Sequence, residues 1–229
     1  MNLQPAMKQT NDPMGALVVH SIFPTIQGEG PFTGHRAIFV RLSGCNLACP
    51  QCDTTYTREN SPLQSPESVV EAINALALGK QLVVITGGEP FRQNLSPAIH
   101  AILAAGYQVQ IETNGTLYQD LPYGDITVVC SPKTGSVHKR LEPHIAALKY
   151  VLDADSVAED DGLPVLALGH TASPRLARPP KGFQGKVYIQ PVDSGNAGDN
   201  LRHLDAAILS TVKYGYILCL QTHKIIGME

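Results

Sequence analysis

Residues 45–52 read Cys45-Asn-Leu-Ala-Cys49-Pro-Gln-Cys52, and they follow an apolar run at residues 37–42 that predicts a β-strand. A [4Fe–4S] cluster usually takes four thiolate ligands, but this loop supplies three. Three ligands leave one iron of such a cluster open to another molecule. We therefore interpret the loop as the ligand set of a cluster that takes part in chemistry.

Structural zinc and disulfides are alternative uses of these cysteines. A closed zinc site needs four ligands, often as two CxxC pairs, and the sequence holds no second CxxC. His20, His35 and Cys130 stand at no zinc-finger spacing from the loop. Five cysteines without a secretory signal do not favour disulfides. The iron–sulfur interpretation is therefore preferred to zinc.

Length and composition indicate one globular domain. The 229 residues suffice for a single core, and 43% hydrophobic and 16% charged residues are ordinary for such a chain. A net charge of −3 argues against a nucleic-acid backbone as partner, and no apolar run has the length of a transmembrane span. We expect residues 1–16 to form a flexible N-terminal extension and residues 17–229 a single domain. A cytoplasmic location is expected, because thiols stay reduced there.

Apolar runs typical of strands alternate with helical patterns along the chain. Strands are predicted at residues 37–42, 81–85, 107–111, 126–130, 148–152, 186–189 and 216–220. A helix should begin at Ser65-Pro66-Glu67, with the serine as its N-cap, and others are predicted at about residues 95–105 and 198–213. The last helix sets one apolar face of Leu201, Leu204, Ile208 and Val212. This alternation predicts a parallel sheet with right-handed crossovers, and residues 169–185 form a surface loop.

Polar or glycine residues follow nearly every predicted strand. After the cysteine loop these segments are Thr86-Gly-Gly-Glu-Pro90, Glu112-Thr-Asn-Gly115, Ser131-Pro-Lys133, Gln190-Pro-Val-Asp193 and Gln221-Thr-His223. In parallel α/β sheets and barrels the active site lies at the carboxyl ends of the strands. The sequence therefore predicts that these segments converge on one site.

A set of motifs in order along the chain resembles the 7-carboxy-7-deazaguanine synthase family of the radical S-adenosylmethionine (SAM) superfamily. The motifs are Ile22-Phe-Pro-Thr-Ile-Gln-Gly-Glu-Gly30, Arg41-Leu-Ser-Gly-Cys45, Cys52-Asp-Thr54, Thr86-Gly-Gly-Glu-Pro90, Ile111-Glu-Thr-Asn-Gly115, Ser131-Pro-Lys133 and Gln221-Thr-His-Lys224. The resemblance runs from about residue 20 to the C-terminus. It implies an α/β fold, a partial (β/α)6 barrel of the radical SAM type that is trimmed in its helices.

The resemblance also implies an activity, that of a carbon–nitrogen lyase in queuosine and 7-deazapurine biosynthesis. The enzyme would convert 6-carboxy-5,6,7,8-tetrahydropterin to 7-carboxy-7-deazaguanine with loss of ammonia, after a 5′-deoxyadenosyl radical abstracts hydrogen from C6 of the substrate. The implied cofactors are a [4Fe–4S] cluster, SAM and Mg²⁺. The implied partners are an electron donor such as flavodoxin or ferredoxin and a second copy of the chain in a homodimer.

Individual site residues are carried over from the same family. Cys45, Cys49 and Cys52 would hold the cluster, and Thr54 would ligate Mg²⁺. The residues assigned to SAM are Gln51, Cys52, Asp53, Gly88, Ser131, Pro132, Lys133, Gln190, Pro191, Val192 and Asp193. Those assigned to the substrate are Ile26, Gln27, Gly28, Arg41, Thr86, Glu112 and His223. Arg41 would pair with the substrate carboxylate, and His223 would hydrogen-bond the substrate or carry a proton.

Two other functions stay open from the sequence. A radical SAM activase that abstracts hydrogen from a glycine of a partner protein fits the length and the cysteine loop. It does not explain Arg41, the Gln-Gly-Glu-Gly segment or the closing Gln-Thr-His-Lys. A non-catalytic interaction module stabilised by zinc would instead unfold when the cysteines of the loop are replaced.

Overall fold

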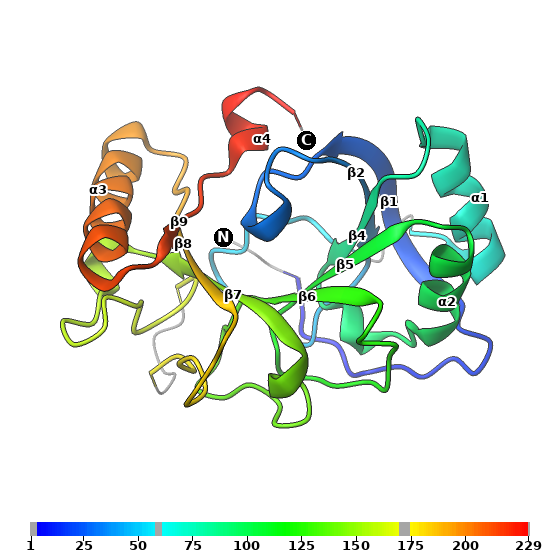
Figure 1. Cartoon of the computed structure of the whole chain (residues 1–229), viewed down its shortest axis with the longest axis horizontal. Helices are drawn as coiled ribbons and strands as arrows, with labels where there is room; N and C mark the ends of the chain where they lie inside the picture. The colour runs from blue at the N-terminus through cyan, green and yellow to red at the C-terminus, as the bar shows by residue number, and fades with distance from the viewer. Residues whose placement is uncertain (1–3, 58–60, 170–174, 229) are drawn as a thin grey trace.

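The computed structural model describes residues 4–57, 61–169 and 175–228. In this part of the chain nine strands form one sheet, which curves around a hollow side (Figure 1). Their order across the sheet is β3-β1-β2-β4-β5-β6-β7-β8-β9. The strands are β1 Leu17–Ile26, β2 Arg36–Leu42, β3 Leu63–Gln64, β4 Leu82–Gly87, β5 Gln108–Thr113, β6 Ile126–Cys130, β7 Ile145–Leu152, β8 Lys186–Pro191 and β9 Ile217–Leu218.

Neighbouring strands run parallel from β2 through β4 to β9, whereas β1 is antiparallel to both β2 and β3. Within the described residues β3 and β9 are the two edges of the sheet, so the barrel stays open. The helices found there are α1 Pro66–Leu76, α2 Ser96–Ala104, α3 Ala197–Tyr214 and α4 Thr222–Ile225, with short 3-10 turns η1 Gly30–Phe32, η2 Pro90–Arg92, η3 Glu142–His144 and η4 Ala154–Ser156. The prediction of a partial barrel with few helices is confirmed.

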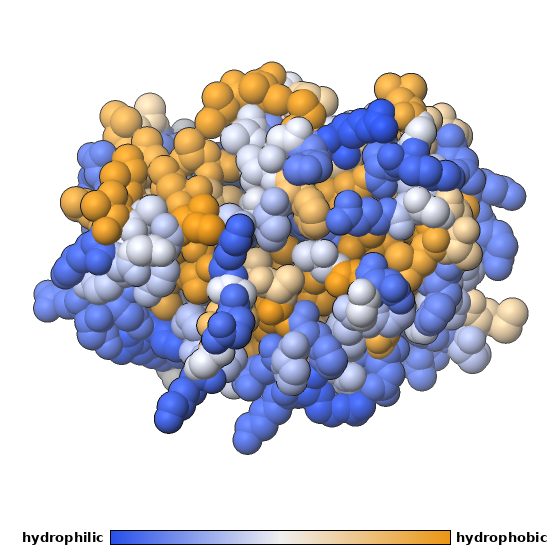
Figure 2. All heavy atoms as spheres, in the orientation of Figure 1, coloured by the Kyte–Doolittle hydropathy of each residue, from blue (hydrophilic) through white to orange (hydrophobic). Residues whose placement is uncertain are grey.

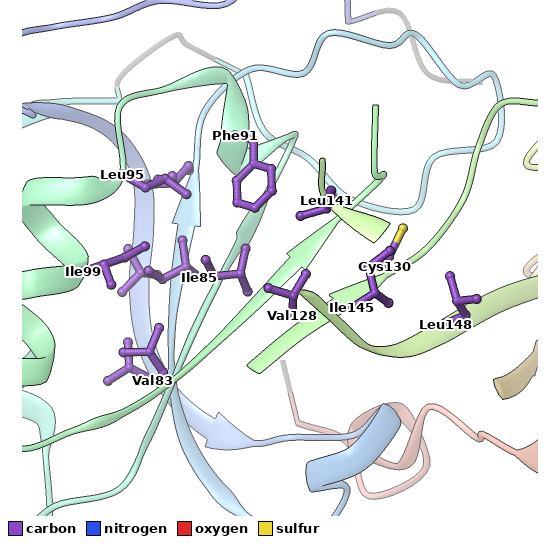
Figure 3. Packing of buried hydrophobic residues seen from close by; sticks show 14 of the residues in the cluster. Val83, Ile85, Phe91, Leu95, Ile99, Val128, Cys130, Leu141, Ile145 and Leu148 are labelled. Carbon is purple, nitrogen blue, oxygen red and sulfur yellow. The ribbon is translucent and has the colours of Figure 1, made fainter. Parts of the chain in front are cut away.

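The outer face of the sheet carries the main hydrophobic core. Successive residues of a strand point to opposite faces, so each strand divides its side chains between two environments. Val83, Ile85 and Val128 face outward and belong to one fully buried cluster with Leu95 and Ile99 (Figure 3). Each such side chain contributes about 1.5–3 kcal/mol through burial. This core fixes the strands, and thereby the positions of the residues between them.

On the inner face of the sheet, residues at the start of the strands pack in an apolar cluster, whereas residues near the carboxyl ends line a cavity. Ala37 and Leu82, paired at the start of β2 and β4, belong to a small buried apolar cluster. Arg41 and Thr86, paired near the ends of the same strands, line a cavity instead. The inner positions of later strands that also line this cavity are Glu112, Val129, Lys149, Val151 and Gln190. The carboxyl ends of the strands therefore converge on one site, as the sequence predicted.

The first helix follows its predicted signals closely. α1 begins after Ser65, whose side chain accepts a hydrogen bond of 3.2 Å from the backbone N–H of Ser68. Val69 and Ile73 on its inward side are fully buried. This capped, amphipathic helix packs beside α2 at one end of the sheet (Figure 1).

Helix α3 has the predicted extent, and Gly215 ends it in the left-handed region with φ of 76°. Its apolar face, however, points to solvent: Leu201 is 63% exposed and Val212 is 79% exposed. The face that α3 buries consists of His203, Ala207 and Ser210.

The burial of this polar face of α3 has a physical reason. His203 Nδ1 accepts a hydrogen bond of 3.0 Å from the backbone N–H of Ala154, and Ser210 Oγ donates one of 2.6 Å to the Gly162 carbonyl. These hydrogen bonds compensate for the loss of hydrogen bonds to water, and the small residues let the helix come close to β8.

Several elements differ from the sequence prediction. Strands β1 and β3 were not predicted, and the closing strand β9 has two residues in place of residues 216–220. The residues that follow form the short helix α4. The predicted surface loop at 169–185 includes residues 170–174, which lie outside the described residues.

Residues 4–16 run along the domain, and their contacts with the cysteine loop are described below. The flexibility of this segment and the boundary at residue 17 stay predictions. No helix among the described residues is both long enough and apolar enough to cross a membrane.

Candidate active site

A cavity of about 620 Å³ opens at the carboxyl ends of the strands. Among the predicted site residues, Ile26, Gly28 and Pro132 do not line it. The predicted site residues that do are Gln27, Arg41, Cys45, Cys49, Gln51, Cys52, Asp53, Thr54, Thr86, Gly88, Glu112, Ser131, Lys133, Gln190, Pro191, Val192, Asp193 and His223. The structure therefore brings the cysteine loop and the later polar segments together.

The three cysteines of the loop face this cavity as free thiols. Burial raises the pKa of the Cys45 thiol to about 12, and burial also raises the pKa values of Cys49 and Cys52. The backbone N–H of Leu47 donates to Cys45 Sγ at 3.4 Å. A buried thiol favours its neutral form until a metal takes the place of the proton. These groups therefore do not carry free thiolate charge.

The donor set suits an iron–sulfur cluster better than a closed zinc site. Among the described residues no group of three or more His, Cys, Asp or Glu side chains is arranged as a ready metal site, and this includes the three cysteines themselves. Three thiols on one loop, facing a cavity large enough for a further ligand, match a cluster with one open iron. The thiols would have to turn toward one another when the cluster binds.

Gly87, the last residue of β4, and Gly88 bring that strand against the cysteine loop. A Cβ on Gly88 would lie 2.1 Å from the carbonyl oxygen of Gly44, and Gly87 has a φ of 126°. Gly88 N donates to the carbonyl of Leu42 at 3.1 Å, and Glu89 N donates to that of Gly44 at 3.0 Å. The absence of side chains at these glycines is thus required by contact with the protein itself, whatever ligand they also meet.

Glu89, fully buried, ties the same turn to the end of β5. Its carboxylate accepts hydrogen bonds from Phe91 N at 3.0 Å, Thr113 Oγ1 at 2.8 Å and Asn114 N at 2.7 Å. Burial raises the pKa of Glu89, and these hydrogen bonds oppose the rise. The role of Glu89 is therefore to hold two loops of the site in register.

Two carboxylates and one lysine form the charged floor of the cavity. Lys149 on β7 makes a close ion pair with Glu29 and lies 3.9 Å from Glu112. Glu112 also accepts hydrogen bonds from Gln27 Nε2 at 3.1 Å and Thr86 Oγ1 at 3.4 Å. Burial alone would raise the pKa of Glu29, but the Lys149 ion pair and hydrogen bond bring it down to about 2. The floor therefore holds Glu29 as an ionised carboxylate in a largely buried place.

A chain of polar contacts runs from this floor to the surface. Gln221 Nε2 donates to Glu29 at 2.8 Å and to Asp53 at 3.4 Å. Lys224 Nζ lies 3.5 Å from the same Asp53 carboxylate and donates to Asp193 at 2.8 Å. Hydrogen bonds, the first from Lys224, lower the pKa of Asp193 to about 2. The C-terminal helix α4 thereby joins the SAM side of the predicted site to its floor.

His223 on α4 packs directly on the Gln-Gly-Glu-Gly segment. A Cβ on Gly28 would lie 1.9 Å from His223 Nδ1, and Thr222 N donates to the Gly28 carbonyl at 3.2 Å. Gly28 thus makes room for the histidine and stays off the cavity wall. Burial lowers the pKa of His223, although Glu29 opposes this, so the imidazole is neutral near pH 7. Met228 N donates to the His223 carbonyl at 2.8 Å, and Met228 also lines the cavity.

Arg41 and Lys133 supply positive charge on the cavity wall. The Arg41 guanidinium lies over the ring of Phe23, 4.9 Å from its centroid. Lys133 Nζ donates to the carbonyl of Ser131 at 2.9 Å. Burial, together with the charge of Lys149, lowers the pKa of Lys133. Both side chains line the cavity, and their binding to a ligand stays a prediction.

Sequence reasoning missed Lys149 altogether and gave Glu29 no role. Glu29 stands inside the Gln-Gly-Glu-Gly motif, and Lys149 interrupts an otherwise apolar predicted strand. A lysine at an inner position of a buried strand was the available signal, since such a charge needs a partner. Tyr56, which is 3% exposed and lines the cavity, was also missed.

Comparison with known proteins shows which families and structures this chain is similar to. Residues 39–153 match the family described as the radical SAM superfamily. The chain is 42% identical over 220 residues to the 7-carboxy-7-deazaguanine synthase of Rhodospirillum rubrum, which covers 92% of each chain. It is 37% identical over 224 residues to the protein of the same name from Rickettsia prowazekii, covering 93% of this chain and 89% of the relative. The crystal structure of QueE from Escherichia coli superposes with a TM-score of 0.66 at 24% identity, over 90% of this chain and 93% of that one.

The open parallel barrel and its three-cysteine loop at the carboxyl ends of the strands define a radical SAM enzyme. This class implies a [4Fe–4S] cluster, SAM, a small-molecule substrate and a source of electrons. Within it, the chain belongs to the 7-carboxy-7-deazaguanine synthase family.

Proposed function

We propose that this chain converts 6-carboxy-5,6,7,8-tetrahydropterin to 7-carboxy-7-deazaguanine with loss of ammonia. The observation that carries the proposal is that the cysteine loop and the charged floor share one cavity of about 620 Å³. Sites for small molecules and cofactors usually enclose about 300–1,000 Å³. A cofactor at the loop and a bicyclic substrate at the floor would therefore lie next to each other.

The cysteine side of the cavity is proposed to hold the cofactors. Cys45, Cys49 and Cys52 would bind the cluster, which with SAM supplies the radical that abstracts hydrogen from C6 of the substrate. The proposed SAM residues lie around them: Gln51, Asp53, Gly88, Ser131, Lys133, Gln190, Pro191, Val192 and Asp193. Thr54, whose hydroxyl donates to Asp53 at 3.2 Å, would turn this oxygen to Mg²⁺ when the ion binds.

The floor of the cavity is proposed to hold the pterin. Arg41 would pair with the substrate carboxylate, because a guanidinium binds a carboxylate in a bidentate, charge-assisted manner. Glu112 lies 3.9 Å from Lys149 and would accept from the N–H groups of the aminopyrimidinone edge, while the Gln27 amide holds this carboxylate in place. Neutral His223 would offer one ring nitrogen to the substrate.

The proposed assembly is a homodimer in the cytoplasm. Helix α3 exposes Leu201, Ile208, Leu209 and Val212, and Figure 2 shows apolar side chains gathered over this helix. Exposed apolar surface of this kind marks interaction sites. A flavodoxin or ferredoxin is proposed as the reductant, and it would approach the exposed side of the cysteine loop at Ala48.

Anaerobic turnover tests the proposed function. The reconstituted enzyme is supplied with reductant, SAM, Mg²⁺ and 6-carboxytetrahydropterin, and the products are followed by mass spectrometry. We expect 7-carboxy-7-deazaguanine that disappears when SAM is left out. Release of 5′-deoxyadenosine without this product would contradict the pterin assignment and favour another radical SAM substrate. The variant Arg41→Lys tests the carboxylate contact. It keeps the positive charge but loses the bidentate geometry, so its KM should be about tenfold higher or more.

A further inference from the structure

The N-terminal segment lies against the cysteine loop. Met7 N donates a hydrogen bond of 2.7 Å to the carbonyl of Cys45, and Ala6 forms an isolated parallel bridge with the same residue. The Gln4 side chain accepts from the backbone N–H of Tyr56 at 2.9 Å and donates to the Thr54 carbonyl at 3.3 Å. The segment thus touches both ends of the loop that carries the three thiols.

The same segment is anchored a second time, on the turn that follows Gly-Gly-Glu-Pro. Thr10 N donates to the carbonyl of Arg92 at 2.7 Å, and Gln9 Nε2 donates to that of Phe91 at 3.0 Å. The Arg92 guanidinium donates back to the Lys8 carbonyl at 3.2 Å. Residues 4–12 therefore connect two loops that are far apart in the sequence.

Three successive carbonyls of the cysteine loop are held by three different groups. The Ser43 carbonyl accepts from Arg92 Nη2 at 2.9 Å, and that of Gly44 accepts from Glu89 N at 3.0 Å. The carbonyl of Cys45, the first cluster ligand, accepts from the N-terminal segment through Met7. The cysteine loop lies between the Gly-Gly-Glu-Pro turn and this segment. Removal of the segment would therefore take away the contacts on one side of the loop.

We propose that residues 4–12 form a strap that positions the cysteine loop and slows loss of the iron–sulfur cluster. The proposal rests on the proposed use of Cys45, Cys49 and Cys52 as cluster ligands. An iron leaves only when its thiolate ligand swings away, and the strap restricts this movement at Cys45 and at the backbone after Cys52. The segment is then part of the cofactor site.

Two substitutions each remove one point of attachment of the strap. Gln4→Ala deletes both side-chain hydrogen bonds to residues 54 and 56, and Met7→Pro deletes the donor to the Cys45 carbonyl because proline has no backbone N–H. Lys8→Ala and Lys8→Pro are the matched controls, since the Lys8 side chain is exposed. Each substitution should shorten the lifetime of the bound cluster about fivefold.

The experiment has two readouts. The first is the half-life of the iron–sulfur absorbance when the reconstituted full chain meets an iron chelator. The second is hydrogen exchange in the metal-free chain at the amides of Gly44 and Tyr56, which donate to the Tyr56 carbonyl and to Gln4. We expect both to change about fivefold in the two variants and to stay unchanged in the controls.

Some outcomes test the strap, and another tests the proposed function. Equal cluster half-lives in the variants and in the wild type would overturn the proposal, even if hydrogen exchange became faster. Unchanged exchange at Gly44 and Tyr56 would overturn it without any reference to iron. A wild-type chain that holds no cluster would contradict the proposed function instead, and the exchange data would still decide whether the strap holds the loop.

Discussion

Replacement of Lys149 by methionine should lower the free energy of unfolding by about 3–5 kcal/mol, since it leaves two largely buried carboxylates without their cation. The Lys149 side chain is 8% exposed, and that of Glu29 is 12% exposed, so solvent screens this pair very little. The pKa of Glu29 falls from 4.5 to about 2 in the folded chain. Each pKa unit corresponds to about 1.4 kcal/mol, so the ionised form of Glu29 gains about 3 kcal/mol.

The pH dependence of this loss follows from the direction of the shift. A carboxylate with a lowered pKa contributes stability above its unfolded pKa of 4.5 and loses it as the pH falls toward 2. In the methionine variant, burial instead destabilises the ionised form of Glu29, and protonation of this carboxylate removes the cost in free energy. The difference from wild type should therefore be large near neutral pH and smaller near about pH 5.

Urea unfolding of the metal-free protein under anaerobic conditions measures this difference at both pH values. The double variant Lys149→Met/Glu29→Gln removes one of the stranded charges at constant shape and should recover part of the loss. A loss below about 1 kcal/mol for Lys149→Met, or one that does not vary with pH, would refute the account of the floor as a compensated ion cluster.

Three further results are expected. Gly88→Ala should cost about 1–3 kcal/mol and reduce iron per chain, because its Cβ would lie 2.1 Å from the Gly44 carbonyl; an unchanged melting temperature would contradict the close approach. Leu209→Glu combined with Val212→Glu on the exposed side of α3 should convert the proposed dimer to a monomer in light scattering, and an unchanged mass would place the interface elsewhere. NMR titration of His223 should give a pKa below 6.5, since burial lowers it; a higher value would mean that Glu29 outweighs burial.

The parts of the fold that the sequence predicted are those with local signals. The N-cap at Ser65 and the strand at residues 126–130 depend on neighbouring residues, and both were placed correctly. The sequence showed the apolar face of α3 but not that it is exposed, because hydrophobic periodicity does not distinguish a buried apolar face from an exposed one. His203 and Ser210 are buried because of hydrogen bonds to distant backbone, which no local pattern contains.

The candidate site likewise has features that local sequence signals predict and features that they do not. The cysteine loop and the polar strand ends were visible because barrels place their chemistry at known positions. The pairing of Lys149 with Glu29 joins residues 120 positions apart, and β1, which ends just before Glu29, does not neighbour β7 in the sheet. The two residues meet because the segment around η1 packs against β7. The first residues of the chain looked like a loose extension because they carry no periodic pattern. Their contacts with Cys45 and Arg92 are made by backbone groups, and the pattern of side-chain types does not predict such contacts.

The closure of the site by α4 has a consequence for the order of events during protein synthesis. Glu29 emerges from the ribosome 192 residues before Gln221, its partner, and Gly28 emerges 194 residues before Thr222. At about 5–20 residues per second the delay amounts to about 10–40 s. For that time the nascent chain has its cysteine loop without Gln221, His223 and Lys224, which line the cavity. The contacts of Gln221 and Lys224 with Asp53 therefore form only after the rest of the described site has been synthesised.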